Sequence, residues 1–462
     1  MHIRRRTVAL AILVICASAP AQKDCNRSSF GLTPLPDLAG GSYRGQPGGL
    51  YPGNSNQIPA PHLAAGLLRA AEIIPRLADG TPDANGRVVL LSIGMSNTTQ
   101  EFSAFVPWSD ADPQRESHLR VIDGAQGGQD ARVFADPNAA AWSVIDQRLA
   151  NAGLAPAQVQ ALWIKEALAA PTSLAWPAHV TELETLMLDV IHNAQTRFPN
   201  AKVAFLSSRT FGGYSTNPAR TEPLSYETAF AMRGLITRQI AQDPALNHDP
   251  NLGLVTAPWL GWGPYLWADG VIPRADGLRW LCEDTVADGV HPSPSGRLNV
   301  ADLLIAHFRT HPVATPWYLG VARTPSAAFI RYGSGCNGST GEPLIAARAA
   351  PIPGNPTFAL QLGGARPLAP ASLFLALARG RVLLGREGCD LWFDPSTLVD
   401  AFAATTDAAG AALWPAAIPN DPAIAGLVFH AQWAILDPAG APIPGVGGLS
   451  FTSGAFVRIG PR

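Results

Sequence analysis

Long hydrophobic runs are scarce in this sequence. Beyond the first 21 residues, no stretch approaches the roughly 20 consecutive apolar residues that cross a bilayer as a helix. Cysteine is also scarce, with five residues in 462 and no Cys-x-x-Cys pair, which argues against a zinc site. Neither positive nor negative charge is in large excess, since the sequence has 33 basic and 35 acidic residues. We therefore expect no transmembrane anchor, no zinc site and no nucleic-acid partner.

The one apolar run near the start belongs to a targeting pattern. Residues 1–21 carry three adjacent arginines, an apolar run from Val8 to Ile15, and then Ala19-Pro20-Ala21. This order is typical of a secretory signal peptide. The sequence thus predicts a secreted or periplasmic protein.

Four cysteines remain beyond that segment: Cys25, Cys282, Cys336 and Cys389. In an oxidising compartment an even number favours disulfides, and three pairings are possible. Their positions along the chain favour Cys336 with Cys389, and Cys25 with Cys282.

Residues 22–310 have the pattern of an α/β domain. An irregular arm rich in Gly, Pro, Asn and Ser covers 22–60, after which short apolar runs alternate with helical stretches. That alternation predicts a parallel sheet with helices packed on it. Within it, Phe102–Gln114 is expected to be a loop because of its prolines, and Leu252–Ala257 a fifth strand.

The last third of the chain has a different composition. Prolines mark a linker at 311–327, and from 328 to 462 short apolar runs alternate with turn signals. This predicts a C-terminal β-sandwich domain. It carries no recognisable catalytic residues, so it binds carbohydrate or a surface, docks a partner, or only stabilises the protein.

A serine follows the first predicted strand of the α/β domain. Val88–Ile93 predicts a strand buried on both faces, and Gly94-Met95-Ser96-Asn97 comes directly after it. This places Ser96 at the carboxyl edge of the sheet, where open α/β sheets bind ligands. The alternative is an ordinary turn.

An acid and a histidine stand close together far downstream. Asp288 precedes His291 by three residues in a Gly- and Pro-containing loop. Such a turn lets the carboxylate orient the imidazole and the imidazole activate a hydroxyl. A helix-capping loop with an incidental histidine is the other interpretation.

Three motifs together resemble those of the SGNH (GDSL-like) hydrolases over roughly residues 85–310. They are Gly94-Met-Ser96, the Gly-rich turn Val121–Gln129 and Asp288-x-x-His291. The resemblance implies a flavodoxin-like three-layer α/β/α fold and a Ser-His-Asp esterase, which needs no metal or organic cofactor. It also implies an oxyanion held by backbone N–H groups of Ser96 or Asn97 and of Gly128. Gly-Met-Ser-Asn is further similar to the Gly-Gln-Ser-Asn of some carbohydrate esterases, which favours small acyl esters such as O-acetyl groups on glycans.

One feature departs from the family pattern. The family's third motif is a strand ending in an oxyanion-donating Asn, but the strand Val159–Leu168 is followed by Ala169. Either Asn97 or Gln126 substitutes, or the protein is slow or inactive. A non-catalytic binding or scaffold protein with a hydrolase fold is therefore the second hypothesis, and a surface or glycan binder acting through the C-terminal domain is the third.

Further residues are candidates for substrate binding. Arg209 follows the predicted strand Lys202–Leu206 and either faces the substrate or forms a structural salt bridge. Trp259 and Trp262 stand in a Gly- and Pro-rich stretch, where they either stack on a sugar or acyl group or simply pack. Gln126, in the Gly-rich turn, is the fourth candidate. The oligomeric state is not predicted.

Overall fold

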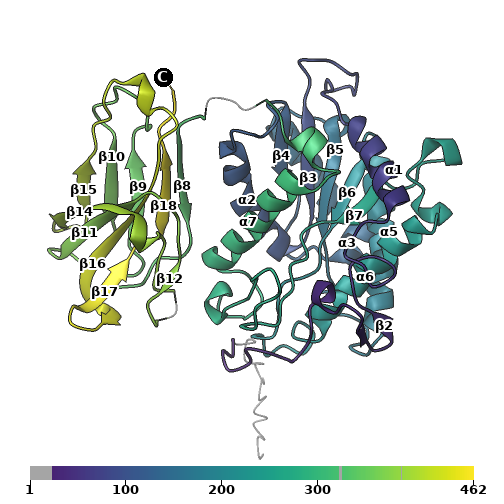
Figure 1. Ribbon diagram of the computed structural model, residues 1–462, viewed down its shortest axis with the longest axis horizontal. Coiled ribbons are helices and arrows are strands. Elements are labelled where there is room, and N and C mark those ends of the chain that lie inside the picture. The colour runs from purple at the N-terminus through teal and green to yellow at the C-terminus, as the bar shows by residue number, and fades with distance from the viewer. Residues whose placement is uncertain (1–22, 322–324, 387, 462) are drawn as a thin grey trace, which may run out of the picture.

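The computed structural model describes residues 23–321, 325–386 and 388–461. The predicted signal peptide lies outside the described residues. Figure 1 shows an α/β part, in which helices surround a parallel sheet, and a β-rich part beside it. In the described ranges, no helix has the length and apolar character needed to span a membrane.

Five parallel strands form the sheet of the α/β part, in the order β4-β3-β5-β6-β7. In chain order the strands are β3 Val88–Gly94, β4 Leu119–Asp123, β5 Val159–Lys165, β6 Val203–Leu206 and β7 Trp259–Trp262. This order, 2-1-3-4-5, is that of flavodoxin-like doubly wound sheets. Every residue of β3 and β5 is buried, because helices cover both faces of the sheet.

Two helix layers enclose the sheet (Figure 1). α2 (Ser96–Ala111) packs with α7 (Pro294–Thr310) on the face toward the β-rich part, while α3, α5 and α6 pack together on the other. α1 (Ala60–Ala71) and α8 (Thr315–Tyr318) lie together, with α1 beside β7. The remaining helices are α3 Ala131–Ala135, α4 Ala140–Asn151, α5 Ala178–Arg197 and α6 Leu224–Ile240. A two-stranded pair, β1 Ser42–Tyr43 and β2 Gln46–Pro47, lies in the N-terminal arm.

Two local predictions were wrong. The segment 102–114 is not a loop, because α2 continues through Pro107 to Ala111. Phe102 stacks on Trp163 and Phe105 packs on Phe308, and this burial offsets the hydrogen bond that proline removes.

The second wrong prediction concerns the fifth strand. Leu252 ends a short 3-10 turn, and Leu254 is 84% exposed, so this segment has no sheet neighbour. The strand that pairs with β6 is β7, whose four residues are all buried.

The β-rich part contains two larger antiparallel sheets that share one core, as a β-sandwich does, and a separate two-stranded pair of β12 and β13. One has the order β15-β10-β9 and the other β14-β11-β16-β18-β8, with β17 paired to β16. Leu360 from the first sheet and Leu373, Trp433 and Val457 from the second are fully buried between them. The strands are β8 Ala328–Tyr332, β9 Leu344–Arg348, β10 Ala359–Gly363, β11 Pro370–Ala376, β12 Val382–Leu383, β13 Asp390–Leu391, β14 Leu398–Thr405, β15 Ala412–Pro415, β16 Val428–Ile443, β17 Gly447–Phe451 and β18 Gly454–Arg458. The predicted class, a parallel α/β sheet followed by antiparallel β structure, is confirmed.

Both favoured disulfide pairings occur. Cys336 and Cys389 join two segments of the β-rich part, with their Cα atoms 4.5 Å apart. Cys25 and Cys282, with Cα atoms 5.4 Å apart, tie the N-terminal arm to the chain just before Asp288.

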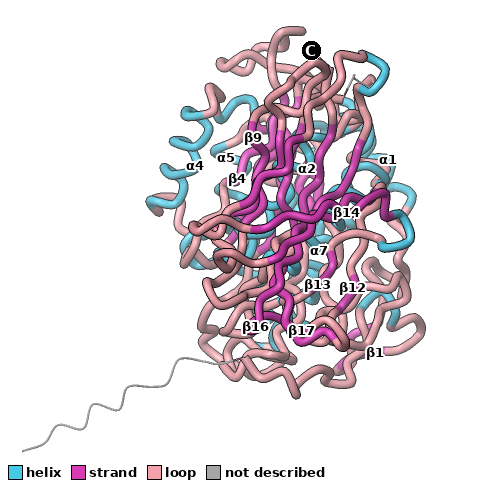
Figure 2. The backbone as a smooth tube through the Cα atoms, turned by 90° about the vertical axis from the view of Figure 1, so that its left-hand side faces the viewer, coloured by secondary structure: helices cyan, strands magenta, loops and turns pink. Residues whose placement is uncertain are grey.

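The β-rich part packs against α2 and α7, which lie behind its strands in Figure 2. Trp108 of α2 contacts the rings of Tyr332 and Phe456. The Arg381 guanidinium joins the two parts, with Nη1 2.8 Å from Asp284 Oδ1 and Nε 2.9 Å from Asp390 Oδ2. Because Asp284 lies four residues before Asp288, the β-rich part helps to hold the segment that leads to the acid and histidine.

Removing the Arg381 cation is expected to destabilise this interface. The side chains of Asp284 and Asp390 are 1% and 2% exposed, so Arg381→Met leaves these two buried carboxylates without the guanidinium that pairs with both. We expect the free energy of unfolding in urea to fall by about 2–3 kcal/mol. Asp302→Asn, which opens the exposed interdomain pair with Arg379, is the control and is expected to cost less than about 1 kcal/mol. Equal losses in the two variants would contradict this account.

Candidate active site

Ser96 stands at the junction of β3 and α2. β3 ends at Gly94, Met95 is extended, and Ser96 is the first residue of the helix. Only glycine fits at position 94, because a Cβ there would lie 2.4 Å from the carbonyl oxygen of Lys165 and from Thr98 Oγ1. The close approach of β3 and β5 thus brings a half-buried serine to the carboxyl edge of the sheet.

The structure brings the three predicted catalytic side chains together. Ser96 Oγ lies 2.7 Å from His291 Nε2, although the two residues are 195 positions apart in the chain. His291 Nδ1 lies 2.5 Å from Asp288 Oδ2. In this arrangement Nδ1–H donates to the carboxylate, and Nε2 is free to accept the serine proton.

Asp288 is held in its ionised form. Partial burial raises the pKa of its carboxyl group, but hydrogen bonds from the His291 ring and from the N–H groups of His291 and Val290 outweigh burial and lower the pKa to about 2. The carboxylate therefore stays charged over the whole range in which an imidazole titrates. Gly289 allows the turn, since its φ is +69° and a Cβ would lie 2.6 Å from the Tyr214 backbone.

Several contacts hold the loop that carries Asp288 and His291. Val286 N–H donates to the His291 carbonyl at 2.9 Å and closes the loop. The Asn97 amide donates to the Val290 carbonyl at 2.8 Å and joins the loop to α2. Asn97 thereby helps to position His291 against Ser96, the residue just before Asn97.

The N-terminus of α2 and the Gly-rich turn lie beside each other at Ser96. The N–H groups of Ser96, Asn97 and Thr98 have no acceptor within the helix, whereas Thr99 N–H donates to the Met95 carbonyl. In the Gly-rich turn, Gln126 N–H donates to the Gly94 carbonyl at 2.8 Å, and a Cβ on Gly127 would lie 4.0 Å from Ser96 Cβ. Gly128 has a φ of +77°, which favours glycine in this exposed turn. Backbone N–H groups without an acceptor are the kind of donor that oxyanion sites use.

Both candidate side-chain amides make structural hydrogen bonds. The Asn97 amide nitrogen donates to the Val290 carbonyl, and that of Gln126 donates to the carbonyls of Gly124 and Ala141 at 3.1 and 2.8 Å. An amide nitrogen has two N–H groups, so these bonds occupy both donors of Gln126 and one of Asn97, which leaves Asn97 as the remaining candidate for the missing donor. The two hydrogen bonds of the Gln126 side chain also stabilise the Gly-rich turn.

The two tryptophans do not lie where a substrate would meet them. Trp259 and Trp262 belong to β7 and are 0% and 3% exposed. Their indole N–H groups donate to the backbone carbonyls of His62 and Leu50. Both are packing residues, and the predicted binding role is corrected. The sequence could not separate strand from loop in this aromatic, Gly-containing stretch.

Sequence reasoning missed a buried ion pair near the serine. Lys165 Nζ lies 2.6 Å from Glu101 Oε1, and their side chains are 3% and 0% exposed. The pair joins Lys165, the last residue of β5, to Glu101 of α2, which lies five residues after Ser96. The available signal was Lys165 itself, a charge at the end of an otherwise apolar run.

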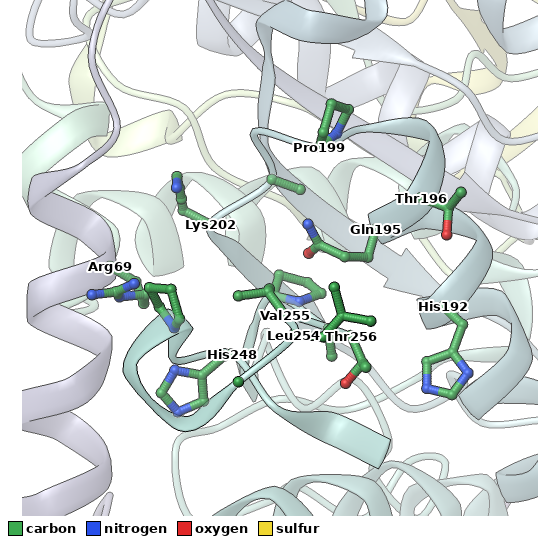
Figure 3. A pocket seen from close by; sticks show the side chains of 15 residues that line it. Arg69, His192, Gln195, Thr196, Pro199, Lys202, His248, Leu254, Val255 and Thr256 are labelled. Carbon is green, nitrogen blue, oxygen red and sulfur yellow. The ribbon is translucent and has the colours of Figure 1, made fainter. Parts of the chain in front are cut away.

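A large cavity lies away from these residues. It holds about 700 Å³ between the C-terminal end of α5 and the loop before β7, with Arg69, Lys202 and His248 among its lining residues (Figure 3). Because Lys202 precedes β6, this cavity is at the amino edge of the sheet, opposite Ser96. Among the residues that the structure describes, no cluster of His, Cys, Asp and Glu is suited to a metal ion.

Comparison with known proteins is uninformative for function. No protein-family model and no curated protein matches the chain. A solved protein named as an acylhydrolase from Bacteroides fragilis NCTC 9343 has 15% identity and a TM-score of 0.25, covering 54% of this chain and 96% of that one. A protein from Arabidopsis thaliana has 10% identity and a TM-score of 0.23, and the match covers 42% of this chain and 61% of that one. A gut microbial diltiazem-metabolizing enzyme has 11% identity and a TM-score of 0.29, and the match covers 65% of this chain and 60% of that one. Similarities at this level leave function to be inferred from the site itself.

Proposed function

We propose that this protein is an exported serine esterase that hydrolyses small acyl esters through an acyl-enzyme. The single observation that carries the proposal is the hydrogen-bonded series Ser96–His291–Asp288, assembled at the carboxyl edge of the sheet. The two disulfides fit an oxidising compartment, as expected for an exported protein.

The arrangement supports a two-step reaction. His291 Nε2 takes the proton of Ser96 Oγ as the oxygen attacks the ester carbonyl, and Asp288 stabilises the imidazolium that forms. Backbone N–H groups of Ser96 or Asn97 and of Gly128 bind the oxyanion. The imidazolium then protonates the departing alcohol, and a water molecule, activated by the same imidazole, releases the acyl group. The favoured substrates are small acyl esters such as O-acetyl groups on glycans, on the resemblance of Gly94–Asn97 to carbohydrate esterases.

A second candidate function is a non-catalytic binding or scaffold role. The observation that favours it is the structural use of the two candidate amides, since both N–H groups of Gln126 and one of Asn97 donate to backbone carbonyls. Removing one oxyanion donor typically costs about 10²–10³-fold in rate where it has been measured.

Labelling with a fluorophosphonate separates the two functions. We expect the probe to react with the wild-type protein and the adduct to map to Ser96 by peptide mass spectrometry, because only an activated serine attacks the phosphorus centre. Ser96→Ala should abolish the labelling. Ser103→Ala, which removes an exposed serine from the same helix, should leave it unchanged. An adduct on another serine would refute the assignment, and no adduct would favour the scaffold role.

A further inference from the structure

Arg209 is a buried cation without a counter-anion. It lies three residues beyond the end of β6 and is 7% exposed. Its backbone N–H donates to Thr228 Oγ1, but within 23–321, 325–386 and 388–461 no hydrogen bond or ion pair reaches its guanidinium. Leaving a buried charge without a partner costs free energy, and an anionic ligand that pairs with it recovers part of that cost.

The carboxylates near Arg209 are all occupied by other donors. Glu222 accepts from the N–H groups of Gly212 and Tyr226 and from the indole of Trp267. Glu101 is bound by Lys165, and Asp288 by the imidazole of the triad. These three acids act on Arg209 only through space, and none of them contacts its guanidinium.

A second guanidinium adds positive charge at the same place. Arg220 follows Ala219, which lines the same cavity as Arg209, and its carbonyl accepts a hydrogen bond from Ser225 Oγ, which belongs to another lining residue. Burial lowers the pKa of Arg209, Glu222 opposes this shift, and the positive charge of Arg220 adds to it. Arg220 is half-buried, and in the described residues no ion pair reaches its guanidinium. Two cations at one cavity, with the nearby carboxylates held by other donors, form a surrounding suited to an anion.

A small cavity of about 20 Å³ lies beside Arg209, at the carboxyl edge of the sheet. Its lining comes from Ala167 and Leu168, which follow β5, from His179 and Leu183 of α5, and from residues next to or within the start of α6, among them Ser225 and Thr228. β5 lies between β3, which delivers Ser96, and β6, which delivers Arg209. The guanidinium and the nucleophile therefore stand at the same edge, on strands separated by one neighbour.

We propose that Arg209, with Arg220 beside it, binds a carboxylate on the ester substrate, so that this protein prefers carboxylate-bearing esters to their neutral analogues. The proposal rests on the proposed esterase function and names its substrate class. A planar guanidinium pairs with a carboxylate through two parallel hydrogen bonds, and a partly desolvated site strengthens such bonds. The walls of the cavity are apolar at Ala167 and Leu168, and Arg209 is the permanently charged residue in a lining whose other polar side chains are those of His179, Ser225 and Thr228.

Matched ester pairs test the proposal in the full-length protein. One pair places the carboxylate on the acyl side, as 4-nitrophenyl hemisuccinate against 4-nitrophenyl butyrate. The other places it on the alcohol side, as 4-acetoxybenzoate against 4-acetoxybenzamide. In at least one pair we expect kcat/KM to be about 10- to 100-fold higher for the charged ester, mainly through KM. Arg209→Met should abolish the difference, Arg209→Lys should retain part of it, and Arg220→Met should reduce it.

The outcomes separate this proposal from the proposed function. Ser96-dependent hydrolysis with no preference in either pair would overturn carboxylate recognition and leave the esterase standing. If no ester is hydrolysed, thermal unfolding of Ser96→Ala is measured with benzoate and with benzamide. A rise in melting temperature with benzoate alone, lost in the Ser96→Ala/Arg209→Met variant, would support the carboxylate site. No rise, or a rise that does not depend on Arg209, would overturn it.

Discussion

Replacement of Ser96 by alanine is expected to lower kcat/KM for 4-nitrophenyl acetate by about 10⁴- to 10⁶-fold, which is the range for losing a triad nucleophile. In the proposed mechanism, the variant loses the oxygen that forms the acyl-enzyme, while the backbone N–H groups of the first turn of α2 remain. Initial rates of the purified protein measure the effect. Ser103→Ala on the same helix should retain full activity.

The effect of Ser96→Ala should not add to that of its neighbour. Because His291 acts by taking the Ser96 proton, His291→Ala should lose a similar factor, and the double variant should be no slower than either single one. Circular dichroism would show that the variants are folded. A Ser96→Ala protein that keeps most of the wild-type rate would place the chemistry elsewhere.

Breaking the buried pair of Lys165 and Glu101 is expected to produce the largest loss of stability. Burial raises the pKa of Glu101 and lowers that of Lys165, and their mutual attraction opposes both shifts. Either single change, Glu101→Leu or Lys165→Met, leaves the other charge buried without its partner. We expect the free energy of unfolding to fall by about 3–5 kcal/mol in each single variant.

The double variant distinguishes pairing from packing. With both charges removed, the loss should be clearly smaller than the sum of the single losses, which urea unfolding in a double-mutant cycle measures. Asp146→Asn, which opens the more exposed pair with Arg197, is the control and should cost less than about 1 kcal/mol. Strictly additive losses would mean that Lys165 and Glu101 act independently.

Much of the fold followed from local patterns in the chain. The buried run at 88–94 was recognisable as a strand, because a parallel strand covered on both faces is apolar throughout. Pro107 misled the prediction for the next segment, since a proline signals a break unless the burial of Phe102 and Phe105 compensates. The aromatic stretch at 259–262 was misread for a related reason: its burial in β7 depends on helices and loops from distant parts of the chain.

The sequence by itself determined the candidate residues: a serine after a buried strand, an acid and a histidine three residues apart, and four cysteines in two pairs. Only the tertiary structure decided which side chains meet. The 2.7 Å contact of Ser96 with His291, the engaged amides of Asn97 and Gln126, the Lys165–Glu101 pair and the unpaired Arg209 all depend on that packing. The physical reason is that short-range patterns fix strands, helices and turns, whereas contacts between residues far apart in the chain depend on how the sheet and its covering helices pack.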